Sequence, residues 1–427
     1  MALPVEQAKV KEDPVAISVN EILKSPSLAS PKPCISKVPN YLRQVNEKAY
    51  EPQLISIGPY HRGKHHLKAM EERKIGFLQQ LVEEKMVMNA SEYVMKMREL
   101  ETQARKCYEQ PLCPDSDEFV KMLLLDGCFI VQLIRSCLKK DLVNYYTNGY
   151  FLALIQDILL VENQLPFFVI WELFSVIETG VDQRMFIEAV FDMFFHRVPG
   201  KGRPKHDLIS VTSEIKHLLD FTYQHCCHPS SSEMEASNET QNFDMNFIRC
   251  ALELQESGIK FETIEGNSMF DIRFENKTLL IPKLNIDDYT ESFLRNLIAF
   301  EQLFVADRDV KHASDYMVLM DSLIDSPKDV EILCQHGIIN NMLGDDKAVA
   351  AMINGLGIYV CHSHNFYYSG VFEDVNKHCS KRWNIWMANL KHNYFNSPWS
   401  LISLMAAILL LLLTVLQTVL SVLSYYQ

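Results

Sequence analysis

The sequence lacks the signatures of several large classes of protein. None of its 11 cysteines forms a Cys-x-x-Cys pair, which excludes zinc ribbons and thioredoxin-like redox motifs. It contains neither Gly-x-Ser-x-Gly nor His-Glu-x-x-His, the motifs of serine hydrolases and many zinc proteases. Basic residues are few, 41 against 54 acidic ones, and the net charge of −13 argues against a nucleic-acid partner. Cysteine is also too sparse in 427 residues for a disulfide scaffold.

The sequence does contain enough apolar residues to bury a large core. Hydrophobic residues make up 48% of the chain and charged residues 22%, a balance typical of globular proteins. Apolar residues recur at helical spacing over 67–88, 116–138 and 187–195. Residues 1–36, in contrast, carry several prolines among serines and lysines, so we expect a flexible N-terminal tail.

The spacing of apolar residues predicts a mainly α fold with a small antiparallel β-sheet, which is an α+β class. Three short runs, 260–264, 270–274 and 278–281, are rich in β-prone residues and are expected to form that sheet. The intervening 275–277, Glu-Asn-Lys, suits a tight turn because Asn tolerates positive φ.

We expect one mainly helical globular domain over residues 37–392. Two polar loops around 199–204 and 228–241 interrupt the helical pattern. They suggest that the domain divides into halves at 37–197 and 243–392.

The longest apolar run lies near the C-terminus, where residues 393–427 carry no charge. Its most apolar part, 399–423, would extend roughly 37 Å as a helix of about 25 residues, which exceeds the ~30 Å hydrocarbon core of a bilayer. We therefore expect a transmembrane helix at 399–423 that contacts the lipid bilayer, followed by a short C-terminal tail at 424–427.

The distribution of charge around this run predicts its orientation. Lys377, Lys381, Arg382 and Lys391 precede it, and no Lys or Arg follows it. The positive-inside rule then places the bulk of the chain in the cytosol, as in a single-pass, tail-anchored protein of the plasma membrane or an endomembrane. The N-terminus shows no signal-peptide pattern, because charged residues interrupt it early.

Several segments of the sequence together resemble a plant family. They read VPNYLR at 38–43, AYEP at 49–52, ISIGPYH at 55–61, MLLLDGCF at 122–129, ENQLPFF at 162–168, DDYTE at 287–291 and NLIAFEQ at 296–302, with YF at 394–395 and PW at 398–399. In combination they resemble the plant Domain of Unknown Function 247 family, over roughly residues 38–426. The resemblance implies a membrane-associated protein without an established enzymatic activity, and some grass members are linked to pollen–stigma recognition.

The most specific chemical hypothesis concerns the loop 58–65, which begins with Gly58 and ends with His65. It has the Walker A skeleton Gly-x-x-x-x-Gly-Lys between a strand-like run and a helix. His65 stands where a Ser or Thr hydroxyl should bind magnesium, and Pro59 removes one backbone N–H. An enzyme or switch that binds a nucleotide or other phosphorylated ligand is therefore the alternative function, and we expect no catalytic residue and no cofactor.

The same loop also supports a simpler binding hypothesis. Tyr60, His61, Arg62, Lys64 and His65 gather at the start of a helix, where free N–H groups and the helix dipole favour an anion. We predict that these five residues contact an acidic protein partner or a phosphate. Two alternatives stay open: the loop is a solvated basic turn, or Tyr60 and His61 pack it onto the following helix.

Two clusters of histidine and cysteine raise the question of a metal site. Residues 225–228 read His-Cys-Cys-His and residues 361–364 read Cys-His-Ser-His. Zinc ligands normally lie at least two residues apart, so neither cluster fits and we expect no metal. The sequence thus favours a membrane-anchored, non-enzymatic recognition or scaffold protein, which binds a protein partner in plant signalling or cell recognition.

Overall fold

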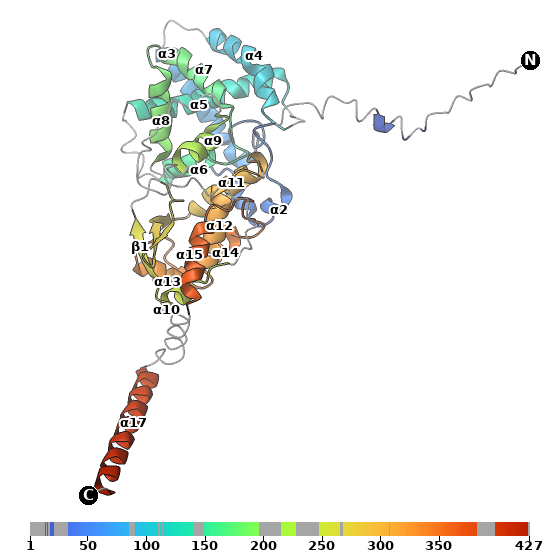
Figure 1. Cartoon of the computed structure of the whole chain (residues 1–427). Helices are drawn as coiled ribbons and strands as arrows, with labels where there is room; N and C mark the ends of the chain where they lie inside the picture. The colour runs from blue at the N-terminus through green and yellow to red at the C-terminus, as the bar shows by residue number, and fades with distance from the viewer. Residues whose placement is uncertain are drawn as a thin grey trace, which may run out of the picture.

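The structure is a computed structural model, drawn in Figure 1. It describes residues 33–84, 90–109, 114–139, 149–195, 215–227, 247–264, 268–306, 308–381 and 398–425, together with positions 13, 15, 18–20 and 112. The protein is mainly helical with small sheets.

The first part of the domain is built from helices. These are α2 (Asn40–Arg43), η2 (Glu47–Tyr50), η3 (His65–Leu67), α3 (Lys68–Glu84), α4 (Ala90–Lys106), α5 (Ser116–Leu138), α6 (Gly149–Ile158), α7 (Phe167–Ile177), α8 (Gln183–Phe195), α9 (Leu218–Thr222) and η5 (Tyr223–Cys227), a π-helical turn. Helix α5 is central, since α3, α4, α7 and α8 all pack against it.

The sequence of α5 explains both its start and its burial. The Asp115 carboxylate accepts a hydrogen bond from the backbone N–H of Glu118 at 2.9 Å, which caps the helix. Apolar residues on nearly every face are buried under neighbouring helices. Gly127 allows α7 to approach closely, because a Cβ at this position would lie 2.3 Å from Cδ1 of Leu173.

The second part of the domain combines helices with two small sheets. Its elements are α10 (Ala251–Glu256), β1 (Lys260–Ile264), β2 (Arg273–Glu275), β3 (Thr278–Pro282), β4 (Leu284–Ile286), α11 (Thr290–Phe304), α12 (His312–Leu323), α13 (Pro327–Gln335), β5 (Ile339–Asn341), α14 (Asp346–Leu356) and α15 (Ser369–Cys379). In Figure 1 these elements lie toward one end of the domain and α3 to α8 toward the other, with α11 between them.

The predicted antiparallel sheet is wrong in its pairing. In the three-stranded sheet β3 is central; β2 pairs with it antiparallel, but β1 pairs with it parallel, with Lys260 opposite Thr278. A second sheet joins β4 and β5 in parallel. Asn276 and Lys277 adopt positive φ, so the predicted turn between β2 and β3 is present. Side-chain alternation locates strands, but it does not say which edge of the sheet each strand takes.

Helix α11 connects the two parts through polar side chains. The Asn296 amide accepts a hydrogen bond from the Val161 N–H at 2.9 Å and donates one to the Ala49 carbonyl at 2.8 Å. The Glu301 carboxylate accepts hydrogen bonds from the backbone N–H groups of Ala313 and Ser314, which fixes the start of α12. The expected halves at 37–197 and 243–392 stay a prediction, because the polar loops 199–204 and 228–241 lie outside the described residues.

Most of the expected N-terminal tail, 1–36, also lies outside the described residues. Its last positions are nevertheless part of the fold: Ile35 is fully buried and forms a parallel bridge with Tyr108. Ordered structure therefore begins before residue 37.

The predicted transmembrane helix at 399–423 is wrong. Helix α17 (Pro398–Tyr425) covers these residues, but the described part of the chain holds no helix with both the length and the apolar character needed to cross a membrane. The prediction considered only charged residues and ignored uncharged polar ones. In the C-terminal half of α17 such residues recur at spacings of three and four and form a polar stripe: Thr414, Gln417, Thr418, Ser421 and Ser424. The predictions of a single-pass, tail-anchored protein with its bulk in the cytosol lose their basis with this helix.

We predict that Gly127→Ala lowers the free energy of unfolding by about 1–3 kcal/mol, because the new methyl group meets the buried Leu173 side chain. Gly76→Ala is the matched control: Gly76 is exposed in α3 with open space around it, so this change should raise stability by about 0.5–1 kcal/mol. Urea denaturation of the whole chain measures both changes. Equal effects of the two substitutions would contradict the close contact between α5 and α7.

Candidate functional site

The loop 58–65 is a packed turn whose first backbone N–H groups are already bonded. The N–H of Ile57 donates to the Asn163 side-chain oxygen at 2.6 Å, and the N–H of Gly58 donates to the Asp126 carboxylate at 2.9 Å. Gly58 has a φ of +76°, and a Cβ there would lie 2.6 Å from the Gln164 carbonyl oxygen. Only glycine fits this position.

The segment between α6 and α7 holds the stretch of chain that leads into this loop. The Asn163 amide, which is fully buried, donates to the carbonyl oxygens of Ile55 at 3.0 Å and Asp157 at 2.8 Å. The Gln164 amide donates to the carbonyl oxygens of Ile158 and Leu160. The Asn163 side chain thus takes the place of part of the regular backbone pairing that residues 51–64 lack, and the Gln164 side chain fixes its own segment.

Asp157, at the end of α6, holds the start of the same segment. Its carboxylate accepts hydrogen bonds from the backbone N–H groups of Gln53, Leu54 and Ile55, at 2.9, 2.6 and 2.9 Å. Burial raises the pKa of Asp157 to about 6, although these three N–H groups and the His61 charge oppose the rise. This carboxyl group therefore titrates near neutral pH.

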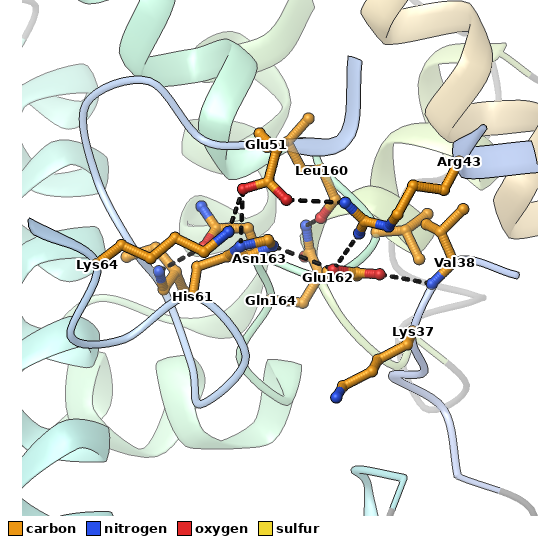
Figure 2. Close-up of polar contacts among 12 residues, drawn as sticks. Lys37, Val38, Arg43, Glu51, His61, Lys64, Leu160, Glu162, Asn163 and Gln164 are labelled. Carbon is orange, nitrogen blue, oxygen red and sulfur yellow. Dashed lines mark hydrogen bonds and ion pairs between the residues drawn. The ribbon is translucent and has the colours of Figure 1, made fainter. Parts of the chain in front are cut away.

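A cluster of charges lies beside Asn163 (Figure 2). Glu162 contacts Arg43 at 2.6 Å and Nε2 of His61 at 3.2 Å. Glu51 contacts Arg43 at 2.8 Å and Nδ1 of His61 at 3.6 Å, and it forms an ion pair with Lys64. His61, only 2% exposed, thus lies between two carboxylates, and Arg43 and Lys64 balance their charge.

The electrostatics of the cluster favour ionised carboxylates. Burial raises the pKa of Glu162, but the His61 and Arg43 contacts outweigh burial and hold this pKa below its ordinary value. The pKa of Glu51 is also lowered, because Lys64, His61 and Arg43 together outweigh its desolvation. Glu162 also accepts a hydrogen bond from the Val38 N–H at 2.6 Å, so it anchors the start of the domain.

A second buried charge pair lies below the same loop. Lys74 and Asp126 are both fully buried and lie 2.6 Å apart. Lys74 also donates to the Ser56 carbonyl at 2.5 Å and forms an ion pair with Glu71. Removing either partner would leave an uncompensated buried charge, which is strongly destabilising.

The five predicted contact residues are placed as follows. The Tyr60 hydroxyl donates to the Ile35 carbonyl at 2.9 Å. Arg62 forms an ion pair with Glu71 at 3.1 Å, and Lys64 forms one with Glu51. His61 is buried, whereas His65, in η3, is exposed. Four of the five are therefore at least partly buried. Their role as a contact for an anion or a partner stays a prediction.

Sequence reasoning missed Arg43, Glu51 and Glu162, although all three lie in segments that carry the family resemblance. Charged residues inside otherwise apolar segments were the available signal. Within the described ranges, no three His, Cys, Asp or Glu side chains are grouped so that they could hold a metal ion. Residue 228 of the first histidine–cysteine cluster lies outside those ranges.

Comparison with known proteins identifies the family. A family model described as a plant protein of unknown function matches residues 35–413. The chain belongs to the plant Domain of Unknown Function 247 family. It is similar to UPF0481 protein At3g47200 of Arabidopsis thaliana, with 31% identity over 422 residues that cover 92% of this chain and 87% of the relative. Putative UPF0481 protein At3g02645 of the same plant is 21% identical over 478 residues, 90% of this chain and 89% of the relative. No solved structure matches the chain.

Five of the segments that carry the resemblance to the Domain of Unknown Function 247 family meet around the loop 58–65 and the segment between α6 and α7. Arg43, His61, Asp126, Glu162 and Asn296 each come from a different one of these segments. Ion pairs or hydrogen bonds connect each of them to the loop 58–65 or to the segment between α6 and α7. In this member of the family, the segments therefore form the internal polar framework of the fold.

We predict that Asn163→Ala lowers the free energy of unfolding by about 2–4 kcal/mol, because it leaves buried backbone groups at Ile55 and Ile57 without partners. Asn340→Ala is the control, since the Asn340 amide bonds to Asn285 on the exposed surface at 3.0 Å. That change should stay within about 0.5 kcal/mol. Thermal or urea unfolding compares the two, and a small effect at Asn163 would contradict its bridging role.

The raised pKa of Asp157 predicts a pH dependence of stability. Between the ordinary Asp pKa of 3.8 and about 6, the folded protein keeps a proton that the unfolded chain has released. The contribution of Asp157 to stability therefore falls as pH rises through this window, by about 3 kcal/mol in total. The unfolding free energy of the native protein minus that of Asp157→Asn should decline from pH 4 to pH 6. A constant or rising difference would contradict the assignment.

Proposed function

We propose that this protein is a non-enzymatic recognition or scaffold protein that binds a protein partner. The observation that carries the proposal is the internal pairing of the chemical groups in the loop 58–65. Lys64 is bonded to Glu51, and the N–H of Gly58 is bonded to Asp126. Groups that are already paired are not free to bind and turn over a substrate.

The alternative, a nucleotide-binding enzyme or switch, requires different geometry. A Walker A loop works through free N–H groups that surround phosphates and a lysine that reaches them. Here the equivalent lysine would have to leave Glu51, and the loop would have to leave Asp126. The nucleotide hypothesis therefore demands a rearrangement that breaks part of the buried polar framework.

A surface feature gives the recognition proposal a location. The rings of Tyr41 and Tyr359 meet edge to face with centroids 5.7 Å apart. Tyr41 is 45% exposed and Tyr359 is 61% exposed. Gln302 holds both, since it accepts from the Tyr41 hydroxyl at 2.8 Å and donates to the Tyr359 carbonyl at 3.2 Å. We call these two residues the tyrosine pair. Exposed tyrosines with fixed geometry are frequent anchors of protein interfaces.

The backbone supports this location. Tyr359 has a φ of +62°, a conformation that bulky residues avoid because it costs of order 1–3 kcal/mol. A glycine would remove this strain, so the tyrosine ring is kept at a cost to folding. Exposed tyrosine rings favour a partner that offers an Arg or Lys side chain, because a cation is attracted to the face of the ring.

The test is chemical crosslinking of the whole chain in plant extract, followed by quantitative mass spectrometry. We predict that Tyr359→Gly reduces the captured partner by about 10-fold or more, as expected for the loss of an interface anchor. The same variant should unfold at an equal or higher temperature, because glycine tolerates positive φ. Met95→Ala, a change at a residue of α4 that is 60% exposed, is the control and should leave capture unchanged.

Two results would contradict the proposal. Equal capture by the native protein and by Tyr359→Gly would remove the tyrosine pair as the contact. Magnesium-dependent ATP or GTP hydrolysis that Lys64→Ala abolishes would instead support the enzymatic alternative.

A further inference from the structure

Two cysteines face each other where the N-terminal segment meets the end of α4. Cys34 precedes the bridge between Ile35 and Tyr108, and Cys107 precedes Tyr108. The backbone N–H groups of Cys34 and Ile35 both donate to the Cys107 carbonyl, at 2.9 and 2.8 Å. The N–H of Glu109 donates to the Ile35 carbonyl at 3.1 Å, which completes the parallel pattern.

The backbone contacts beside this bridge hold the two cysteines together. The N–H groups on both sides of the Cys34 Cα donate to the Cys107 carbonyl, and a hydrogen bond joins the two thiols. A disulfide requires ~4.4–6.8 Å between Cα atoms, a separation that such direct backbone neighbours can reach. Both residues are only partly buried.

We propose that Cys34 and Cys107 form an oxidation site, in which a peroxide converts the two thiols into a disulfide. Ile35 and Tyr108 are buried in the core and fix the backbone beside the two cysteines, while Cys34 and Cys107 are themselves only partly buried. Nothing in the proposed recognition function requires this site, and the two proposals are independent.

The two thiols have different roles. A hydrogen bond from Cys34 lowers the pKa of the Cys107 thiol, although partial burial opposes this. The same hydrogen bond, together with burial, raises the pKa of Cys34. These directions favour Cys107 as the thiolate that attacks and Cys34 as the thiol that resolves the product.

The chemistry balances with a peroxide as the oxidant. The Cys107 thiolate attacks one peroxide oxygen, the O–O bond breaks, and the leaving hydroxide takes up a proton to become water. This step oxidises Cys107 to a sulfenic acid and reduces the peroxide by two electrons. The Cys34 sulfur then attacks the Cys107 sulfur, the S–O bond breaks, and the departing hydroxide takes the Cys34 proton. The net products are one disulfide and two waters.

The disulfide would join the start of the domain covalently to the end of α4. The Cys34 carbonyl also contacts Nε2 of His217 at 3.1 Å, and the Tyr60 hydroxyl bonds to the neighbouring Ile35 carbonyl. Oxidation would thus close a covalent ring of residues 34–107, which contains the loop 58–65 and contacts His217 at the start of α9. We expect the oxidised protein to melt at a higher temperature than the reduced protein, because a crosslink restricts the unfolded chain.

The test uses the whole chain, fully reduced and then treated with hydrogen peroxide. Free thiols are alkylated, the protein is digested without reductant, and peptides are identified by mass spectrometry. We expect a peptide that links Cys34 to Cys107 and that disappears on treatment with dithiothreitol. Cys361→Ser, a change at an exposed cysteine outside the pair, is the control and should leave this linkage intact.

Variants of the pair test the assigned roles. In Cys34→Ser, Cys107 should be trapped as a sulfenic acid by dimedone; in Cys107→Ser, Cys34 should remain a thiol that alkylates. If a variant fails to fold, the linkage in the native protein still decides the proposal. Alkylation of both cysteines under conditions that oxidise Cys361, or linkage of Cys107 to a different cysteine, would overturn it.

Discussion

The buried polar side chains between α6 and α7 are the interaction on which the first part of the domain depends. Residues 51–64 run through the interior without regular secondary structure, so other groups must satisfy their backbone N–H and carbonyl groups. Asp157, Glu162 and Asn163 provide these partners from a single short segment. An unpaired polar group at such a position would cost about 1–3 kcal/mol, so each of these side chains stabilises the fold.

This constraint also explains the charges that first suggested a binding site. Lys64, His61 and Arg43 surround two carboxylates, and the pKa of each carboxylate is lowered by these neighbours. A cluster of this kind can be mistaken for a catalytic site, because active sites also combine buried charge and shifted pKa values. Here the charges neutralise each other and connect segments that are distant in sequence. The surface beyond them, including the tyrosine pair, is where contact with a partner costs no internal bond.

The same polar framework also holds the start of the domain in place. Tyr60 reaches from the loop to the Ile35 carbonyl, and Glu162 accepts from the N–H of Val38. The start of the domain is therefore attached to the same polar framework that holds the loop. A covalent change at Cys34 would act on a segment that is already part of this network.

Local sequence patterns determined several helices, including α3 and α5, and the sites of β1 and β3, but they missed α4, β4 and β5. The acidic start of α5, its apolar run and the Asn276 turn were all predictable, because helix caps, periodicity and turn chemistry involve residues close together in the chain. The family segments were also recognisable in the sequence. Only the tertiary structure decided the parallel pairing of β1, the burial of His61 and the pairing of Arg43 with Glu162. It also overturned the membrane span expected at 399–423. The physical reason is that a charged residue could pair with any of many residues of opposite charge along the chain. Only the packing of elements that are distant in sequence brings one of them within reach.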